Sequence, residues 1–117
     1  LLSRTSAPAL ESALILVGSE WLNTLVMVAT EFGRTVAFNG TGGTDHGTAS
    51  AAMLFGGALA NGGNIVADWP GLKASQLYEG RDLKPTMRFE QFASDALARH
   101  YGLDPARTRA SLFPDFA

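Results

Sequence analysis

The chain has 117 residues and no cysteine, with 9 lysines and arginines against 11 aspartates and glutamates. Without cysteine there is no disulfide framework and no thiolate metal site, and a net charge of -2 lacks the basic excess typical of nucleic-acid binding. The uncharged stretch from Gly47 to Ala67 is interrupted by glycines and asparagines, which excludes a membrane span. Composition therefore predicts one small soluble domain over residues 1–117, complete or part of a larger one.

The N-terminal half combines one helix pattern with apolar runs. Apolar residues at helical spacing predict a helix over residues 7–21, with Ser6 as its N-cap. Residues 25–29 form a continuous apolar run without alternation, which is typical of a strand buried on both faces of a parallel sheet. The sequence also predicts buried strands at residues 50–55 and 64–67, and a loop over residues 31–48.

The last third of the chain predicts two helices. Thr86 is expected to cap a helix that ends before Gly102, because glycine suits the left-handed position after a helix. Asp104 followed by proline predicts the start of a further short helix. The apolar face of the first helix comprises Phe89, Phe92, Ala93, Ala96, Leu97 and Tyr101, and we expect its phenylalanines to lie in the core.

Helices alternating with short buried strands predict an α/β fold, in which helices flank a mostly parallel sheet. Three strands are few for such a sheet, because parallel sheets normally have more strands and are covered on both faces. The chain also begins at Leu1, without a methionine. We therefore expect the sheet to continue in a larger α/β domain of which this chain is a part.

The first candidate site follows the strand predicted at residues 25–29. Ligands of open α/β sheets bind outside the carboxyl ends of strands, which is where Glu31 and Arg34 fall. Glu31 offers hard oxygen atoms, and the Arg34 guanidinium can hold a phosphate, sulfate or carboxylate by two hydrogen bonds. The alternative is that Glu31 and Arg34 simply pair with each other across a turn.

The second candidate site is the adjacent pair Asp45 and His46, which lies in a glycine-dense segment. Asp45 is the only formally charged residue between Arg34 and Asp68. Carboxylate and neutral imidazole suit zinc, manganese or iron, and carboxylate-rich sites suit magnesium, manganese or calcium. The alternative is that Asp45 closes an Asx turn and that His46 is an ordinary surface or core residue.

Several segments together carry a family resemblance. They are LVMVATEFGRT at residues 25–35, GTDHG at residues 43–47 and DLKPT at residues 82–86, with Asn39 and glycine pairs at residues 56–57 and 62–63. In order and spacing, nearly the whole chain resembles the C-terminal portion of the sulfatase-like family called domain of unknown function 1501. That family is similar to the alkaline phosphatase and sulfatase superfamily, whose α/β sandwiches carry metal ions at strand ends.

The resemblance implies roles for particular residues. Glu31 falls where superfamily relatives often have the aspartate of an Asp-His metal pair, and Asp45 and His46 fall in a further ligand segment. The implied cofactor is a divalent metal ion, Zn, Mn, Mg or Ca, and Arg34 is the implied anion clamp. Phe32 departs from the superfamily pattern, because histidine usually follows the first acidic ligand. The resemblance places the nucleophile and the remaining ligands N-terminal to Leu1, so this chain alone is expected to be inactive.

Two functions follow as hypotheses. The first is a part of a metal-dependent hydrolase of phosphate or sulfate esters, acting on an anionic small molecule or polymer. The second is a non-catalytic sulfatase-like protein that binds a glycan or a protein partner. The family resemblance implies export to the periplasm or beyond, often through a twin-arginine signal. An exposed sheet edge would favour a homo-oligomer.

Overall fold

The computed structural model describes residues 17–59 and 62–116, and these residues fall into two compact units. The first unit comprises the described residues up to 28 and from 53 to 64. The second comprises residues 29–52 and the described residues from 65 onward. None of the helices in the described residues has the length and apolar content needed to span a bilayer.

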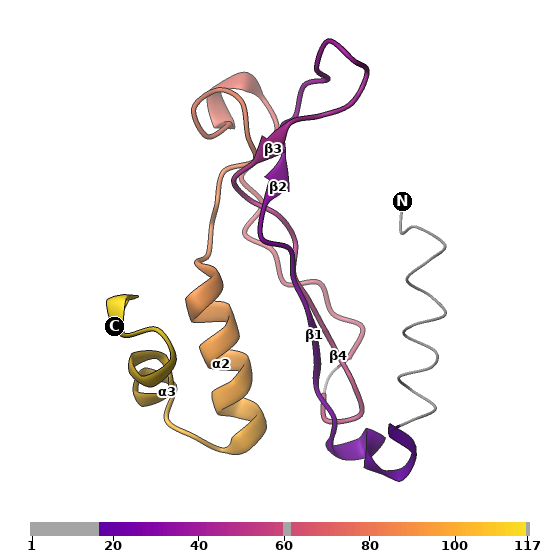
Figure 1. The fold of residues 1–117 in the computed structure, drawn as a ribbon, viewed down its shortest axis with the longest axis vertical. Helices are drawn as coiled ribbons and strands as arrows, with labels where there is room; N and C mark the ends of the chain where they lie inside the picture. The colour runs from indigo at the N-terminus through magenta and orange to yellow at the C-terminus, as the bar shows by residue number, and fades with distance from the viewer. Residues whose placement is uncertain (1–16, 60–61, 117) are drawn as a thin grey trace. The chain divides into compact units, whose positions relative to one another are not determined.

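The first unit is built on one short antiparallel ladder. Strand β1 (Val26–Val28) pairs with β4 (Met53–Phe55), with Met27 opposite Leu54, and the two strands run side by side in Figure 1. A 3-10 helix, η1 (Gly18–Asn23), precedes β1. Its end is fixed to the ladder, because the carbonyl oxygen of Trp21 accepts hydrogen bonds from the amides of both Thr24 and Gly57.

The predicted α/β fold with a mostly parallel sheet is wrong. The sheets of the described residues are two antiparallel pairs of strands. Residues 25–29 do contain a strand, but Val26 and Met27 are only half-buried and Val28 is exposed. A short apolar run does not specify the direction of its partner, and here a returning segment supplies an antiparallel one.

The other strand predictions have mixed outcomes. The strand predicted at residues 50–55 is confirmed in its second half by β4, but it is not buried, because Met53 is exposed and the next two residues are only half-buried. Residues 64–67 form no strand, and Ile65 and Val66 are 93% and 92% exposed. The helix predicted over residues 7–21 lies mostly outside the described residues, and its described end belongs to the 3-10 helix η1.

The second unit contains a small hairpin followed by helices. The hairpin joins β2 (Gly33–Arg34) to β3 (His46–Gly47), so the prediction of a loop throughout residues 31–48 is wrong. After the 3-10 helix η2 (Ala74–Gln76), the chain forms α2 (Phe89–Tyr101), α3 (Pro105–Leu112) and the 3-10 helix η3 (Pro114–Phe116).

Both predicted C-terminal helices are confirmed, and local signals set most of their ends. Gly102 ends α2 in the left-handed conformation, with a φ of 65°. The Asp104 carboxylate caps α3 by accepting a hydrogen bond of 2.8 Å from the amide of Arg107. The N-cap of α2 is Arg88 rather than the predicted Thr86, and no side chain caps the helix there.

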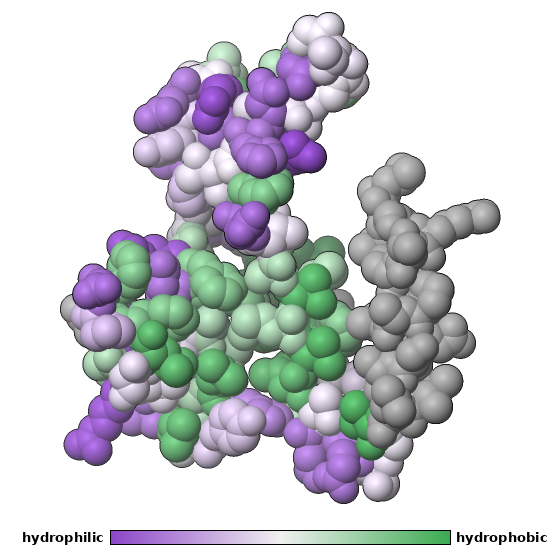
Figure 2. Space-filling model, in the orientation of Figure 1, coloured by the Kyte–Doolittle hydropathy of each residue, from purple (hydrophilic) through white to green (hydrophobic). Residues whose placement is uncertain are grey.

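Small residues make up the buried face of α2. Ala93, Ala96, Ala98 and Ser94 are buried, and the Ser94 hydroxyl contacts the carbonyl oxygens of the preceding turn. Phe89, predicted to lie in the core, is 50% exposed. Figure 2 shows hydrophobic residues gathered on the surface over α2 and α3. The helix therefore buries its small side chains, whereas Phe92, also predicted to lie in the core, and Leu97 are only half-buried.

A tight turn at residues 78–81 leads back toward the hairpin. The Arg81 amide donates a 3.1 Å hydrogen bond to the Tyr78 carbonyl oxygen. Glu79 and Gly80, the two central residues, have φ values of 52° and 67°. Positive φ at both central positions is the signature of a type I′ turn, which favours asparagine followed by glycine. Glu79 therefore occupies a conformation that suits asparagine better than glutamate.

We expect Glu79→Asn to stabilise the protein. The gain should be about 0.5–1 kcal/mol, a part of the roughly 1–2 kcal/mol that the left-handed conformation costs an ordinary L residue. Urea unfolding measures it. Glu79→Gln is the matched control, because it removes the same charge but keeps an unbranched side chain ill-suited to this conformation. Equal stability changes in the two variants would contradict the turn assignment.

Candidate functional site

The hairpin of β2 and β3 brings the two predicted site segments together. In its antiparallel register Gly33 lies opposite Gly47, and Arg34 lies opposite His46. Residues directly opposite each other in an antiparallel pair project their side chains from the same face. The register thus places one residue of the EFGRT segment beside one residue of the GTDHG segment.

Phe32 lies against both of these side chains. Its ring stacks on the His46 imidazole, with the ring centroids 3.8 Å apart and the planes inclined by 19°. The guanidinium carbon of Arg34 lies 5.7 Å from the Phe32 ring centroid, within range of a cation–π interaction. Sequence reasoning treated Phe32 only as a missing histidine, whereas its ring is the surface against which His46 packs.

Asn39 organises the loop between the two strands. Its side-chain oxygen accepts hydrogen bonds from the amides of Thr41 and Gly43 and from the Thr41 hydroxyl, at 2.8–3.1 Å. Its side-chain nitrogen donates to Oδ1 of Asp45 at 2.9 Å. Asn39 therefore shapes the loop and orients the Asp45 carboxylate, a role that sequence reasoning missed although the residue belongs to the family pattern.

An open groove runs beside β2. Glu31 and Arg34 both line it, but no ion pair joins them, so the pairing considered from the sequence does not form. Nη1 of Arg34 instead donates a 3.0 Å hydrogen bond to the Thr44 carbonyl oxygen. The Thr30 hydroxyl lies 2.9 Å from that of Ser50 on the same groove. The remaining lining residues are Phe32, Gly33, Val36, Ala49, Trp69, Leu72 and Leu83.

The predicted metal ligands do not form one cluster. Asp45 and His46 are neighbours at the start of β3, and Glu31 lies on the groove. Within residues 17–59 and 62–116, no group of three or more carboxylate or imidazole side chains is arranged to hold a metal ion. The three residues have suitable donor atoms, and their assignment as metal ligands stays a prediction.

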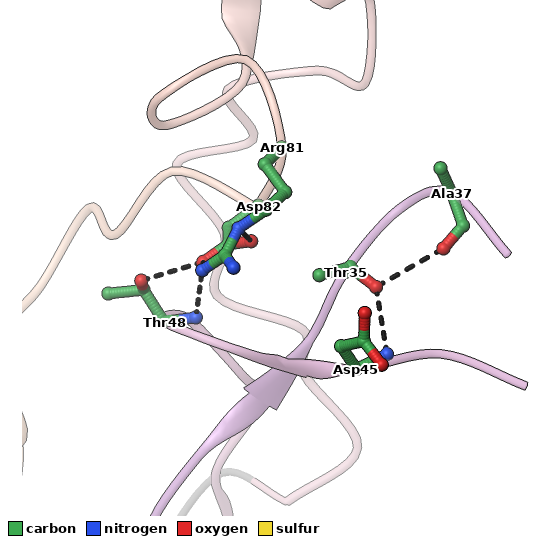
Figure 3. A network of polar contacts seen from close by, with 6 residues as sticks. All are labelled: Thr35, Ala37, Asp45, Thr48, Arg81 and Asp82. Carbon is green, nitrogen blue, oxygen red and sulfur yellow. Dashed lines mark hydrogen bonds and ion pairs between the residues drawn. The ribbon is translucent and has the colours of Figure 1, made fainter. Parts of the chain in front are cut away.

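A buried carboxylate supports the hairpin from outside it. Asp82 is 1% exposed, and its Oδ2 accepts hydrogen bonds from the Thr48 amide at 3.0 Å and the Thr48 hydroxyl at 2.9 Å. Nη2 of Arg81 donates to the same oxygen at 3.1 Å. Nε of Arg81 lies 2.8 Å from Oδ1, an ion pair without hydrogen-bond geometry, so Oδ1 has no hydrogen bond within the described residues. Figure 3 shows this network.

The environment of Asp82 keeps its carboxyl group ionised. Burial raises the pKa of Asp82, but hydrogen bonds from Arg81 and Thr48, together with the charge of Arg81, lower it by more. The net pKa therefore lies below its ordinary value. Sequence reasoning missed Asp82, whose one signal was its place in the DLKPT segment; its charge resembled others in that region.

Thr35 connects the same network to the other strand. It is 8% exposed and lies in a bridge with Asp82, and its amide donates to the Asp45 carbonyl oxygen at 3.1 Å. Its hydroxyl accepts a hydrogen bond from the Asp45 amide and donates one to the Ala37 carbonyl oxygen (Figure 3). The strand that carries Arg34 and the strand that carries His46 are thus joined immediately beyond their short ladder.

The family model described as "Protein of unknown function (DUF1501)" matches residues 11–112. No curated protein and no solved structure matches the chain.

Close approach of the two strands requires glycine at position 47. A Cβ atom on Gly47 would lie 2.6 Å from the backbone carbon and 2.7 Å from the carbonyl oxygen of Arg34. We expect Gly47→Ala to lower the free energy of unfolding by about 1–3 kcal/mol, because backbone atoms must move to admit the methyl group. Urea denaturation measures the loss, and hydrogen exchange at the Thr35 amide locates it.

Gly40→Ala is the matched control for this prediction. Gly40 lies in the loop of the same hairpin, and a Cβ atom there would meet nothing within 4 Å. We expect its effect to stay within about 0.5 kcal/mol, as for most surface substitutions. Similar losses in the two variants would show that the hairpin does not depend on close contact at Gly47.

Proposed function

The chain belongs to the DUF1501 family, and we propose that it forms part of a metal-dependent hydrolase of phosphate or sulfate esters. In this proposal Arg34 holds the anionic group of the ester, and Glu31, Asp45 and His46 are metal ligands. The sulfatase-like relationship of the family enters the proposal through the sequence resemblance alone.

The observation that carries the proposal is that the charge of Arg34 is exposed on the groove and is not neutralised by a carboxylate among the described residues. Two other arginines of the second unit form ion pairs. Arg81 pairs with Asp82, and Arg88 pairs with Glu90. Arg34 is exposed on the groove and has no carboxylate partner among the described residues. Its hydrogen bond to the Thr44 carbonyl oxygen fixes one nitrogen and leaves the others to face a ligand. A planar guanidinium fork of this kind matches the oxygens of phosphate and sulfate.

The neighbouring side chains fit an ester site in their chemistry. Glu31 presents a carboxylate on the same groove, and the Thr30 and Ser50 hydroxyls lie close together there. Asn39 orients the Asp45 carboxylate, and Phe32 orients the His46 imidazole. A divalent ion held by these donors would neutralise charge on the transferred group. A complete ligand set needs side chains beyond these three, because they do not form one cluster.

We expect Arg34→Ala to weaken binding of inorganic phosphate or sulfate by roughly 10- to 100-fold, because hydrogen bonds to a charged group contribute about 1.5–3 kcal/mol. Arg34→Lys should recover only part of this loss, since an ammonium keeps the charge but not the two-point geometry. Isothermal titration measures the affinities. Turnover of aryl phosphates and aryl sulfates with added Zn, Mn, Mg or Ca then tests hydrolysis, and Glu31→Gln should reduce it.

Arg99→Ala is the control for these measurements. Arg99 is an exposed arginine in the last turn of α2 and does not line the groove. Its loss removes the same charge and should leave phosphate affinity unchanged. Equal weakening by Arg34→Ala and Arg99→Ala would mean that only overall charge matters, and the proposed anion site would then be wrong.

A second candidate is a non-catalytic protein that binds a sulfated glycan. Trp69 favours it, because this side chain is 64% exposed and lines the groove together with Arg34. A groove lined by both an aromatic ring and a guanidinium suits a ligand that combines a ring with an anionic substituent, as a sulfated sugar does. This candidate differs from the first in requiring affinity without turnover.

Trp69→Ala separates the two candidates. If the groove holds a sulfated oligosaccharide, this variant should bind it about 2- to 10-fold more weakly, while its affinity for inorganic sulfate is unchanged. Phe38→Ala is the control, because Phe38 is 82% exposed and does not line the groove. Unchanged oligosaccharide affinity in Trp69→Ala, or turnover of sulfate esters by the wild type, would argue against this candidate.

A further inference from the structure

The segment at residues 81–82 holds both strands of the hairpin. On the β2 side, the Val36 amide donates a 3.1 Å hydrogen bond to the Arg81 carbonyl oxygen, and Thr35 is bridged to Asp82. On the β3 side, the Asp82 carboxylate accepts both hydrogen bonds from Thr48. The residues after Arg34 and after Gly47 are therefore tied to one short segment, by its backbone on one side and by its carboxylate on the other. Figure 3 shows the contacts of the carboxylate.

We propose that Asp82 is a positioning residue, which fixes the register in which Arg34 and His46 face each other. Thr48 follows β3 directly and lies two residues after His46, so a contact that fixes Thr48 also fixes the position of β3 along β2. A slip of one residue would turn His46 to the opposite face, away from Phe32 and Arg34. Anchoring Thr48 at both its amide and its hydroxyl opposes such a slip.

The ladder itself is too short to hold this register. Each strand contributes two residues, and an isolated two-stranded hairpin is marginally stable at best in water. The contacts of Asp82 are stronger than ordinary loop contacts, because an ionised acceptor makes charge-assisted hydrogen bonds. They are also protected from water, since the carboxylate is buried.

The same contacts argue against a direct role for Asp82 in metal or anion binding. Oδ2 is occupied by the Thr48 amide, the Thr48 hydroxyl and Arg81, and Oδ1 lies against the Arg81 guanidinium. Asp82 does not line the groove. It acts on a ligand only through the placement of Arg34 and His46, and in that respect this inference rests on the proposed function.

The experiment reads the position of His46 directly. The chain has two histidines, and His100 lies on α2 with its ring edge-on to Tyr101. In proton NMR of the full chain, stacking on Phe32 should shift the ring signals of His46 upfield. In Asp82→Asn, whose amide cannot serve both Thr48 and Arg81 as the carboxylate does, we expect these signals to move toward the values of free histidine. Exchange of the Thr48 amide should become at least about tenfold faster, because its charge-assisted hydrogen bond to the carboxylate is weakened or lost.

Four comparisons keep this test specific. The signals of His100 should not move in Asp82→Asn, and Asp115→Asn, which removes an exposed carboxylate without a partner among the described residues, should change neither histidine. Thr48→Val removes only the hydroxyl contact and should shift His46 in the same direction by less, whereas Thr48→Ser should resemble the wild type. If Asp82→Asn does not fold, the shift of the His46 signals in Thr48→Val tests the proposal instead.

The outcomes separate this inference from the proposed function. Unchanged His46 signals in a folded Asp82→Asn variant, or in Thr48→Val if Asp82→Asn does not fold, would overturn the positioning role. If His46 moves and the wild type binds phosphate, the variant should bind phosphate more weakly, by a factor no larger than that of Arg34→Ala. If His46 moves but the wild type binds neither phosphate nor sulfate, the positioning role stands and the proposed function fails.

Discussion

The buried carboxylate of Asp82 is the interaction on which the candidate site depends. A buried charge is tolerated only when its partners replace the water that it has lost, and here Arg81 and Thr48 do so. Arg81 and Thr48 stabilise the buried charge of Asp82, and the carboxylate in turn holds these two residues in place. Thr48 is thereby fixed just beyond β3, although the ladder that precedes it is only two residues long.

Three arginines of the second unit show how their surroundings assign different roles to one side chain. Arg81 neutralises the buried Asp82, and Arg88 pairs with Glu90 while its guanidinium lies 4.3 Å from the Phe116 ring centroid. Both are committed to contacts within the protein. Arg34 contacts a carbonyl oxygen and an aromatic ring, neither of which neutralises its charge. An anionic ligand would supply the neutralisation that the other two arginines obtain internally.

Local sequence signals predicted the helices better than the strands. The ends at Gly102 and Asp104 follow from residues in direct contact with the helix termini, so the sequence specifies them. The pairing of β1 with β4 and of β2 with β3 depends on residues distant in the chain, and apolar runs do not reveal direction or partner. For the site, Glu31, Arg34, Asp45 and His46 were proposed from residue type and spacing, and their roles stay predictions. Asn39 and Asp82 were not, because their importance arises from hydrogen bonds across loops.

Phe32 determines how His46 can meet a ligand. From the sequence it was considered only as the absence of a histidine that the superfamily resemblance implied. In the hairpin, however, it stacks on the face of His46. In a neutral imidazole the lone pair of one nitrogen and the N–H bond of the other both lie in the plane of the ring, so a neighbour on the face leaves the ring edge available to a metal ion or an anion. Phe32 thus restricts the orientation of His46 without blocking its nitrogens. Phe32 therefore acts as a support for His46, and the direction of approach to His46, edge-on from beside the Phe32 ring, is the main constraint on any ligand of this site.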